Sequence, residues 1–174
     1  MLAALKNLPK GCAYAIHKSP VGDLYLIASE KGLHALLFEL EMKECACRDL
    51  FAAMKKDPRH PILARALNQL EEYFAKKRKS FDLPLIPFGT DFQLKAWREL
   101  SRIPYGKTIS YQEQARRVGD EKKCRAVGTA NSRNPLAIVV PCHRVIAQSG
   151  ALSGFGGGVS TKKFLLELEG RAHA

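Results

Sequence analysis

The chain has 174 residues, 46% of them hydrophobic, which is enough to build one ordinary domain or two small ones around apolar cores. The apolar patch before Lys6 is too short for a signal peptide, and no later apolar run approaches membrane-spanning length, so we expect neither export nor a membrane partner. The 28 Lys and Arg against 17 Asp and Glu give a net charge of +11, which fits a polyanionic partner or a merely solvated basic surface.

The cysteines indicate a reducing compartment. Their number is five, which is odd, and without a secretory context this favours free thiols and a cytoplasmic location, at the nucleoid if the source is prokaryotic. Cys45 and Cys47 form a C-x-C pair, with Cys12, His17 and His34 upstream. Structural zinc is the alternative reading, but no C-x-x-C pair or matched second half completes such a site. We therefore expect no metal and no cofactor.

The first half of the chain has the pattern of a small α/β unit. Short apolar and alternating runs between residues 12 and 40 are separated by turn residues, which predicts an antiparallel hairpin or meander. Apolar residues at steps of three and four predict a helix over residues 61–77, ending in the basic run 76–79. Pro84, Pro87 and Gly89 then mark a linker near residues 82–90, so we expect one domain in 1–88 and another in 89–174.

The second half is more basic and predominantly helical. Residues 89–174 carry 14 basic and 7 acidic side chains, a net +7, whereas residues 1–88 carry 14 and 10, a net +4. Thr90 with Gln93 forms a capping box that opens one helix, and Ser110 with Glu113 repeats it for a second helix ending near Val118. A turn at 119–120 leads to a third helix, so this segment has the order of a helix-turn-helix.

The third helix of this motif has unusual side chains. Arg125 is followed by Ala126, Val127, Gly128, Thr129 and Ala130, where a recognition helix usually displays long polar side chains. These small residues permit tight helix packing, or they allow a close approach to a groove with little reading of base edges. Arg125 at the head of the run fits the second alternative, because an arginine can act as a wedge when one base is displaced.

A thiol and an imidazole lie side by side in Ala137 to Val145, AIVVPCHRV. Residues 137–140 predict a buried strand or extended run that delivers Cys142 just after Pro141. A buried cysteine is usually inert, but a cysteine near a base can be a nucleophile. Adjacent side chains usually diverge, so His143 could serve Cys142 directly or through a water.

An imidazole that acts as a base needs a carboxylate to orient it. The candidates are Glu167 and Glu169, on a predicted helix that begins near Ser160 and ends at Gly170. Spacing alone does not choose between them.

These residues together resemble a known family, the O6-alkylguanine-DNA alkyltransferases, or methylated-DNA–protein-cysteine methyltransferases. The resemblance rests on Pro141-Cys142-His143-Arg144-Val145, Asn134-Pro135, Arg125-Ala126-Val127-Gly128, Ser110-Tyr111-Gln112, Gly156-Gly157, Lys162, Leu165-Leu166 and Glu169-Gly170. The resemblance covers nearly all of residues 88–170. Residues 1–87 fit the family only by their length and their pattern of apolar residues. It implies an α/β fold with a small N-terminal ribonuclease H-like domain and a mainly helical, winged helix-turn-helix-like C-terminal domain.

The resemblance also assigns roles in the reaction. It implies that Cys142 accepts the alkyl group, that His143 relays the thiol proton through a water, and that Glu169 orients and charges His143. Asn134 corresponds to the residue that joins the recognition helix to the active-site segment. Tyr111 corresponds to the tyrosine that donates a proton toward the departing guanine.

Residues that contact DNA are implied in the same way. Arg125 corresponds to the finger that fills the base stack when the damaged nucleotide rotates out through the minor groove. The other implied DNA contacts are Ser110, Ala126, Gly128 and Thr129. The implied substrate pocket consists of Tyr111, Val145, Phe155, Gly156 and Gly157, with the backbone of Val145 recognising the exocyclic amine.

The implied function is direct repair of double-stranded DNA by one irreversible transfer of an alkyl group from O6-alkylguanine, and from O4-alkylthymine, to Cys142. Thiolate is a strong, soft nucleophile suited to this displacement. The thioether product has no easy hydrolytic exit, so the protein reacts once and stops. We expect a monomer that needs no cofactor and that can cluster along DNA.

Three positions depart from the family pattern. Phe155 stands where many relatives have tyrosine, Gly156 replaces a serine of some members, and Ala137 replaces a proline. We therefore expect a roomier or more mobile pocket. Two rival functions remain: a non-reactive helix-turn-helix regulator, which would not need Cys142, and a cysteine hydrolase, which would need an oxyanion hole and would turn over repeatedly.

Overall fold

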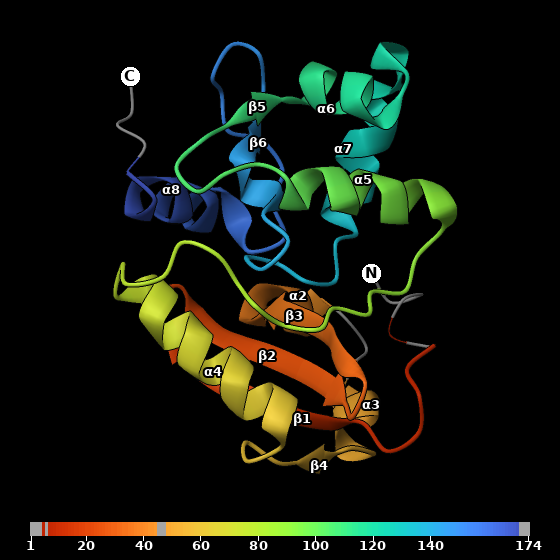
Figure 1. Ribbon diagram of the computed structural model, residues 1–174, viewed down its shortest axis with the longest axis vertical. Coiled ribbons are helices and arrows are strands. Elements are labelled where there is room, and N and C mark those ends of the chain that lie inside the picture. The colour runs from red at the N-terminus through yellow and green to blue at the C-terminus, as the bar shows by residue number, and fades with distance from the viewer. Residues whose placement is uncertain (1–4, 6, 45–47, 171–174) are drawn as a thin grey trace.

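The computed structural model describes residue 5, residues 7–44 and residues 48–170 of the chain. A sheet with its covering helix, residues 7–44 and 48–74, forms the lower half of the molecule in Figure 1. A mainly helical upper half, residues 91–170, lies above it. Residues 75–90, which contain no helix, run between the two halves. Within the described part of the chain, no helix is both long and apolar enough to cross a membrane.

The lower half is built on a four-stranded sheet with the order β3-β2-β1-β4. β1 (Ala13–Ser19), β2 (Gly22–Ser29) and β3 (Gly32–Phe38) form the predicted antiparallel meander. A fourth strand that the meander pattern did not indicate, β4 (Lys55–Lys56), pairs in parallel with β1. A parallel neighbour needs a crossover connection, and this one carries the short helices α2 (Glu39–Glu44) and α3 (Arg48–Ala52).

Helix α4 (Pro61–Phe74) lies along the sheet and contacts β1, β2 and β3. The prediction carried this helix to residue 77, which is too long. The chain leaves the helix because Lys76 has a left-handed φ of 59°. The amides of Lys76 and Lys77 then donate to the carbonyls of Tyr73 and Glu72, at 3.0 and 2.8 Å, which is a Schellman ending. The basic run 76–79 therefore lies beyond the helix.

The edge of β3 is covered by two later segments. Leu33 pairs in parallel with Leu85 of the connecting segment, and Leu36 pairs in parallel with Leu136 of the upper half. The amide of Leu36 donates to the carbonyl of Pro135 at 2.7 Å. Because this edge strand pairs with the chain just before Cys142, the lower half helps to position the segment that carries Cys142.

The upper half contains the predicted helix-turn-helix. Helix α5 (Asp91–Ser101) packs against α6 (Tyr111–Val118) and α7 (Cys124–Ser132), which also pack against each other. Gly119, with φ 108°, and a 3₁₀ turn (Glu121–Lys123) connect α6 to α7. A two-stranded parallel pair, β5 (Ile109–Ser110) and β6 (Val145–Ile146), and helix α8 (Gly158–Leu168) complete the half.

The two predicted capping boxes differ. Thr90 and Gln93 exchange both hydrogen bonds, so the box that opens α5 is confirmed. At α6 only half of the box forms: the Ser110 hydroxyl accepts from the Glu113 amide at 3.0 Å. The Glu113 carboxylate instead pairs with Arg116 and Arg117, because charged partners on the next turn are a stronger attraction than a neutral amide.

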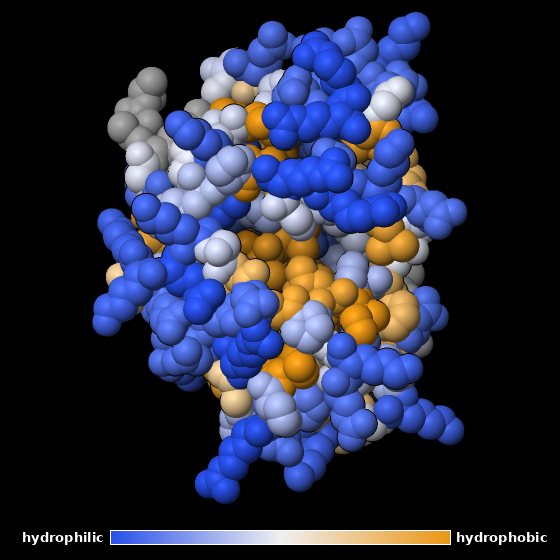
Figure 2. All heavy atoms as spheres, in the orientation of Figure 1, coloured by the Kyte–Doolittle hydropathy of each residue, from blue (hydrophilic) through white to orange (hydrophobic). Residues whose placement is uncertain are grey.

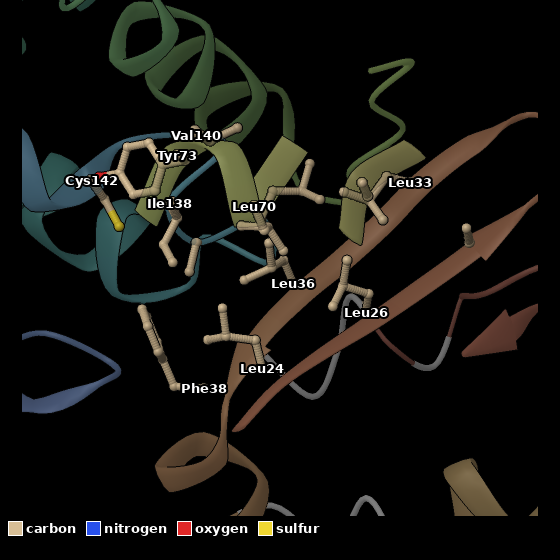
Figure 3. Packing of buried hydrophobic residues seen from close by; sticks show 14 of the residues in the cluster. Leu24, Leu26, Leu33, Leu36, Phe38, Leu70, Tyr73, Ile138, Val140 and Cys142 are labelled. Atoms are coloured by element: carbon tan, nitrogen blue, oxygen red, sulfur yellow. The ribbon is translucent and has the colours of Figure 1, made fainter. Parts of the chain in front are cut away.

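One buried apolar cluster runs through both halves. It includes Leu24, Leu36 and Leu70 from the sheet and α4, together with Ile138 and Cys142 from the upper half, as Figure 3 shows. On the face seen in Figure 2, apolar residues gather across the middle, while hydrophilic residues dominate both ends. Cys142 is thus part of the packing that joins the halves.

Candidate active site

The predicted strand at residues 137–140 is wrong: this run is a tight turn that leads into Cys142. The amides of Val139 and Val140 donate to carbonyls two and four residues earlier, both at 2.8 Å. Ile138 has a φ of 68°, a strained conformation for a β-branched residue. The sequence resembles that of a strand because its side chains are apolar and mostly buried. Only the Ala137 amide pairs with the sheet, at 3.1 Å from the Leu36 carbonyl, and the amides of Val139 and Val140 make turn bonds instead.

Asn134 fixes this turn and contacts the thiol. Its Oδ1 accepts a hydrogen bond from the Leu136 amide at 3.0 Å, and its Nδ2 donates to the Val140 carbonyl at 2.8 Å. The same Nδ2 lies 3.3 Å from Sγ of Cys142. Asn134 is buried two residues after the end of α7, so one side chain connects the helix-turn-helix to the sulfur.

Cys142 begins a 3₁₀ turn (Cys142–Arg144), and the side chain of His143 points into a fully buried network. Nε2 of His143 donates to Oε1 of Glu169 at 2.9 Å. Of the two carboxylates that the sequence left open, the structure therefore brings Glu169 to the imidazole. Glu167 lies on the exposed side of α8, 4.0 Å from Lys163.

Glu169 is also held by groups that the sequence analysis did not assign. Arg144 donates to both carboxylate oxygens, at 2.8 and 2.9 Å, and its third nitrogen donates to the Ile103 carbonyl at 2.6 Å. The hydroxyl of Tyr73, from α4 in the lower half, donates to Oε1 at 2.8 Å. The Gly106 amide donates to Oε2 at 3.1 Å. The carboxylate is thus fixed from both halves of the protein.

This network sets the protonation of His143. Burial acts to raise the pKa of Glu169, but the hydrogen bonds from His143 and Arg144 outweigh it and hold that pKa far below its usual 4.5. Burial lowers the pKa of His143 below 6.5 despite the bond to Glu169. A neutral imidazole whose Nε2 donates to an ionised carboxylate carries its lone pair on Nδ1. Nδ1 is buried and has no hydrogen-bond partner among the described residues.

The thiol is protonated at neutral pH in this structure. Burial raises the pKa of Cys142 to about 11, and the negative charge of Glu41 adds to the rise. The hydrogen bond from Asn134 and the positive charge of Lys162 oppose it without cancelling it. A nucleophilic Cys142 therefore requires a base, and the lone pair of His143 is a basic site in the same buried region.

Tyr111 and Val145 lie together near the thiol. Tyr111 opens α6, its ring faces Gly128 of α7, where a built Cβ would lie 3.8 Å from Cε1, and burial raises its pKa. Nζ of Lys162 lies 5.7 Å from the Tyr111 ring centroid and donates to the Val145 carbonyl at 2.7 Å. Tyr111 is therefore protonated at neutral pH, and Lys162 connects its ring to the Val145 carbonyl.

The remaining pocket residues pack on the lower half. The ring of Phe155 lies 5.3 Å from that of Phe38 and 6.5 Å from that of His143. A Cβ built on Gly157 would lie 2.8 Å from Phe38, and one built on Gly156 would collide with the carboxylate of Glu41. Glu41 therefore occupies the place that a side chain at Gly156 would take, and the expectation of a roomier or more mobile pocket stays a prediction.

The predicted DNA-contacting residues lie around the first turns of α6 and α7. Arg125, Ala126 and Thr129 are exposed on α7, and Gly128 is half-buried against Tyr111. Ser110 is the half-buried N-cap of α6. The structure thus presents a surface of small side chains with one long arginine, close to the Tyr111 ring.

The sequence contains a pattern that indicates one further buried residue near the site. Lys162 shares helical spacing with Leu165, Leu166 and Glu169, so a buried lysine on the inner face of α8 was readable. Tyr73, Phe38 and Glu41 belong to ordinary strand and helix patterns in the first half and carried no such signal. Within the described residues no group of His, Cys, Asp and Glu could hold a metal, and Cys45 and Cys47 lie outside that part of the chain.

A helix-turn-helix with a buried thiol at its base, backed by an imidazole and a carboxylate, defines a cysteine-dependent transferase that acts on DNA. Residues 12–87 match the family model described as 6-O-methylguanine DNA methyltransferase, ribonuclease-like domain. Residues 91–171 match the model of the DNA binding domain of the same family. The chain belongs to the 6-O-methylguanine DNA methyltransferase family, which confirms the resemblance and the two-part fold class.

Individual relatives agree with this assignment. The methylated-DNA–protein-cysteine methyltransferase of Methanosarcina acetivorans is 45% identical over 157 residues, covering 90% of this chain and 97% of that protein. A crystal structure of Mycobacterium tuberculosis O6-methylguanine methyltransferase superposes with a TM-score of 0.81 at 43% identity, covering 94% of this chain and 96% of that one. A crystal structure of M. tuberculosis OGT in complex with DNA superposes with a TM-score of 0.79 at 44% identity, covering 90% of this chain and 92% of that one.

Proposed function

We propose that the protein repairs alkylated DNA by moving the alkyl group from O6 of guanine to the sulfur of Cys142, once per molecule. Membership of the family supplies the reaction class, which is transfer from methylated DNA to a protein cysteine. The observation that carries the choice of acceptor is the contact of Cys142 with Asn134, beside the His143–Glu169 pair. Cys12 and Cys124 have no comparable surroundings among the described residues.

The first step is ionisation of the thiol. Its proton passes through a water to Nδ1 of His143, and the resulting imidazolium is stabilised by Glu169. Asn134 donates to the sulfur and stabilises the thiolate. The buried, protonated resting state keeps the nucleophile from reacting before a substrate is in place.

The second step is displacement. The sulfur electron pair forms a bond to the alkyl carbon, the bond from that carbon to O6 breaks, and its electrons pass into guanine. Tyr111 donates its hydroxyl proton to the departing guanine. The proton that His143 took from the thiol then passes through water to the Tyr111 phenolate, so both residues return to their neutral forms. Tyr111 is suited to this role because burial keeps it protonated. The thioether left on Cys142 has no easy hydrolytic exit, so one molecule repairs one lesion.

Access to the base requires that the nucleotide leave the stack. We assign the wedge to Arg125 and the close contact with the minor groove to Ala126, Gly128, Thr129 and Ser110. Small side chains permit this approach at any sequence, and unstacking costs a few kcal/mol that phosphate contacts can offset. Val145 and the loop with Phe155, Gly156 and Gly157 then enclose the guanine. O4-alkylthymine, which presents an alkylated oxygen in a similar position, is a second substrate.

The setting of the reaction follows from the same proposal. The protein works in the cytoplasm at the DNA, as a monomer that can cluster along a duplex. Its division into domains 1–88 and 89–174, with a linker near 82–90, assigns DNA contact to the half with the larger net charge, +7.

The test is the mass of the protein and of its peptides after incubation with excess duplex that contains O6-methylguanine. Unmodified duplex and a Cys142→Ala variant are the controls. One methyl group per chain, on the Cys142 peptide, with guanine restored, supports the proposal. Binding of the lesion without a mass change would favour a regulator, and repeated turnover would favour a hydrolase.

A further inference from the structure

The loop of residues 153–157, here called the pocket loop, rests on the lower half of the protein. Phe155 packs on Phe38 at a ring distance of 5.3 Å. The two glycines that follow approach so closely that a Cβ on Gly157 would lie 2.8 Å from Phe38 Cγ, and a Cβ on Gly156 would lie 2.7 Å from Glu41 Cδ. Glycine at both positions therefore lets the loop backbone pack closely on Phe38 and Glu41, where an added side chain would not fit without a shift of its neighbour.

Glu41 is well placed to hold the loop. It lies on α2, directly after β3, and only 6% of its surface is exposed. Its Oε2 accepts a hydrogen bond from the amide of Phe38 at 2.9 Å, so the carboxylate is turned back toward the strand. Oε1 then faces Gly156. A buried carboxylate is costly unless its surroundings fix it, so this position is defined by contacts rather than by solvent.

We propose that Glu41 is a positioning residue for the pocket loop and thereby sets the size of alkyl group that the pocket accepts. Its carboxylate occupies the space beside Gly156 and keeps Phe155 against His143. With the loop held there, a methyl group fits better than a bulky group such as benzyl. This inference rests on the proposed alkyl transfer and adds to it a residue of the first half.

The complementarity of Glu41 and Gly156 makes the inference testable by a double-mutant cycle. The rates to compare are those of single-turnover transfer from O6-methylguanine and O6-benzylguanine in the same duplex. Gly156→Ala alone should push the loop off its seat and slow methyl transfer about tenfold. Glu41→Ala in the same chain should restore most of that rate, because the added methyl group then has space. Glu41→Ala alone should raise the ratio of benzyl to methyl transfer severalfold.

Glu39→Ala is the matched control, because it removes another carboxylate from the same helix. Oε2 of Glu39 lies near Gly22, away from the pocket loop. This variant should neither change the benzyl to methyl ratio nor rescue Gly156→Ala. Glu41→Gln keeps the volume and an acceptor for the Phe38 amide, so its ratio should stay that of the unaltered protein. Rescue by Glu39→Ala, no rescue by Glu41→Ala, or a Glu41→Gln ratio as high as that of Glu41→Ala would each overturn the proposal.

A second readout does not depend on transfer. Cys142 can be labelled without DNA by iodoacetamide, which is small, or by N-benzylmaleimide, which is bulky, and quantified by peptide mass. Glu41→Ala should raise bulky labelling relative to small labelling, and Glu39→Ala should not. If the unaltered protein transferred no methyl group, the proposed function would fail, while this labelling ratio would still decide whether Glu41 positions the loop.

Discussion

The hydroxyl of Tyr73 donates a 2.8 Å hydrogen bond to Oε1 of Glu169, the same oxygen that holds Nε2 of His143. Tyr73 lies on α4, and its side chain is fully buried. The helix that covers the sheet therefore contributes a donor to the carboxylate behind the proposed base. The lower half does more than support the fold, because it takes part in fixing His143.

Tyr73→Phe should slow alkyl transfer about three- to tenfold and destabilise the protein by about 1 to 2 kcal/mol, since a hydrogen bond to a charged group is lost while the ring contacts remain. Urea unfolding and single-turnover transfer measure the two effects. Tyr14→Phe is the control, because Tyr14 packs in a different buried cluster. A full transfer rate in Tyr73→Phe would show that the hydroxyl does not help to position Glu169.

Asn134→Ala should lower the transfer rate at least about a hundredfold while DNA binding persists. The variant loses the donor to Cys142 and leaves the Leu136 amide and the Val140 carbonyl without their partner, which should also cost about 2 to 4 kcal/mol of stability.

Asn131→Ala is a matched control, because Asn131 is another buried asparagine, paired with Gln114 at 2.7 and 3.0 Å inside the helix-turn-helix. It should lose stability but keep the transfer rate of its folded fraction. Equal losses of transfer in the two variants would mean that Asn134 acts only through stability.

Local signals in the sequence predicted much of the fold. The meander, the helix-turn-helix and the Thr90 cap depend on neighbours within a few residues, and all three are present. The run 137–140 was misread because its apolar side chains also fit a strand. Its turn depends on the side chain of Asn134, whose contacts periodicity does not reveal.

The residues of the candidate site likewise fall into those that the sequence indicates and those that it does not. Cys142 and His143 are adjacent in the sequence, and the family motif pointed to Glu169, which the structure places at His143. Tyr73 and Glu41 reach the site only because the first half packs on the second. Tyr73 is 96 residues from its partner Glu169, so no spacing rule in one sequence could pair them.

Arg125→Ala should leave the fold intact, because the side chain is exposed, and should slow transfer from a fully paired duplex about tenfold or more. The loss should shrink when the lesion lies in a mismatch or a single strand, where flipping is cheaper. Arg133→Ala, at the other end of α7 and also exposed, is the control and should weaken binding only at low salt. An equal loss of transfer rate on duplex and on single-stranded substrate would rule out the role of Arg125 as a wedge.

Acid should destabilise the protein through the buried network. The folded-state pKa values of His143 and Glu169 both lie below their ordinary 6.5 and 4.5. Below each ordinary value the unfolded chain binds a proton that the folded chain does not, so the free energy of unfolding falls as the pH falls. The loss begins near pH 6.5 with His143 and grows below pH 4.5 with Glu169, at about 1.4 kcal/mol per pH unit for each proton.

His17 and His34, whose pKa values burial also lowers, add a loss of the same sign. Urea unfolding of the unaltered protein and of His143→Gln at pH 7.5, 6.5 and 5.5 isolates the contribution of His143, since Gln does not titrate. The variant should be less stable at pH 7.5 but should show a shallower slope between the two lower values. Identical slopes would mean that folding does not change the pKa of His143. A steeper slope in the variant would mean that His143 is already protonated in the folded protein, and a base for Cys142 would then have to be sought elsewhere.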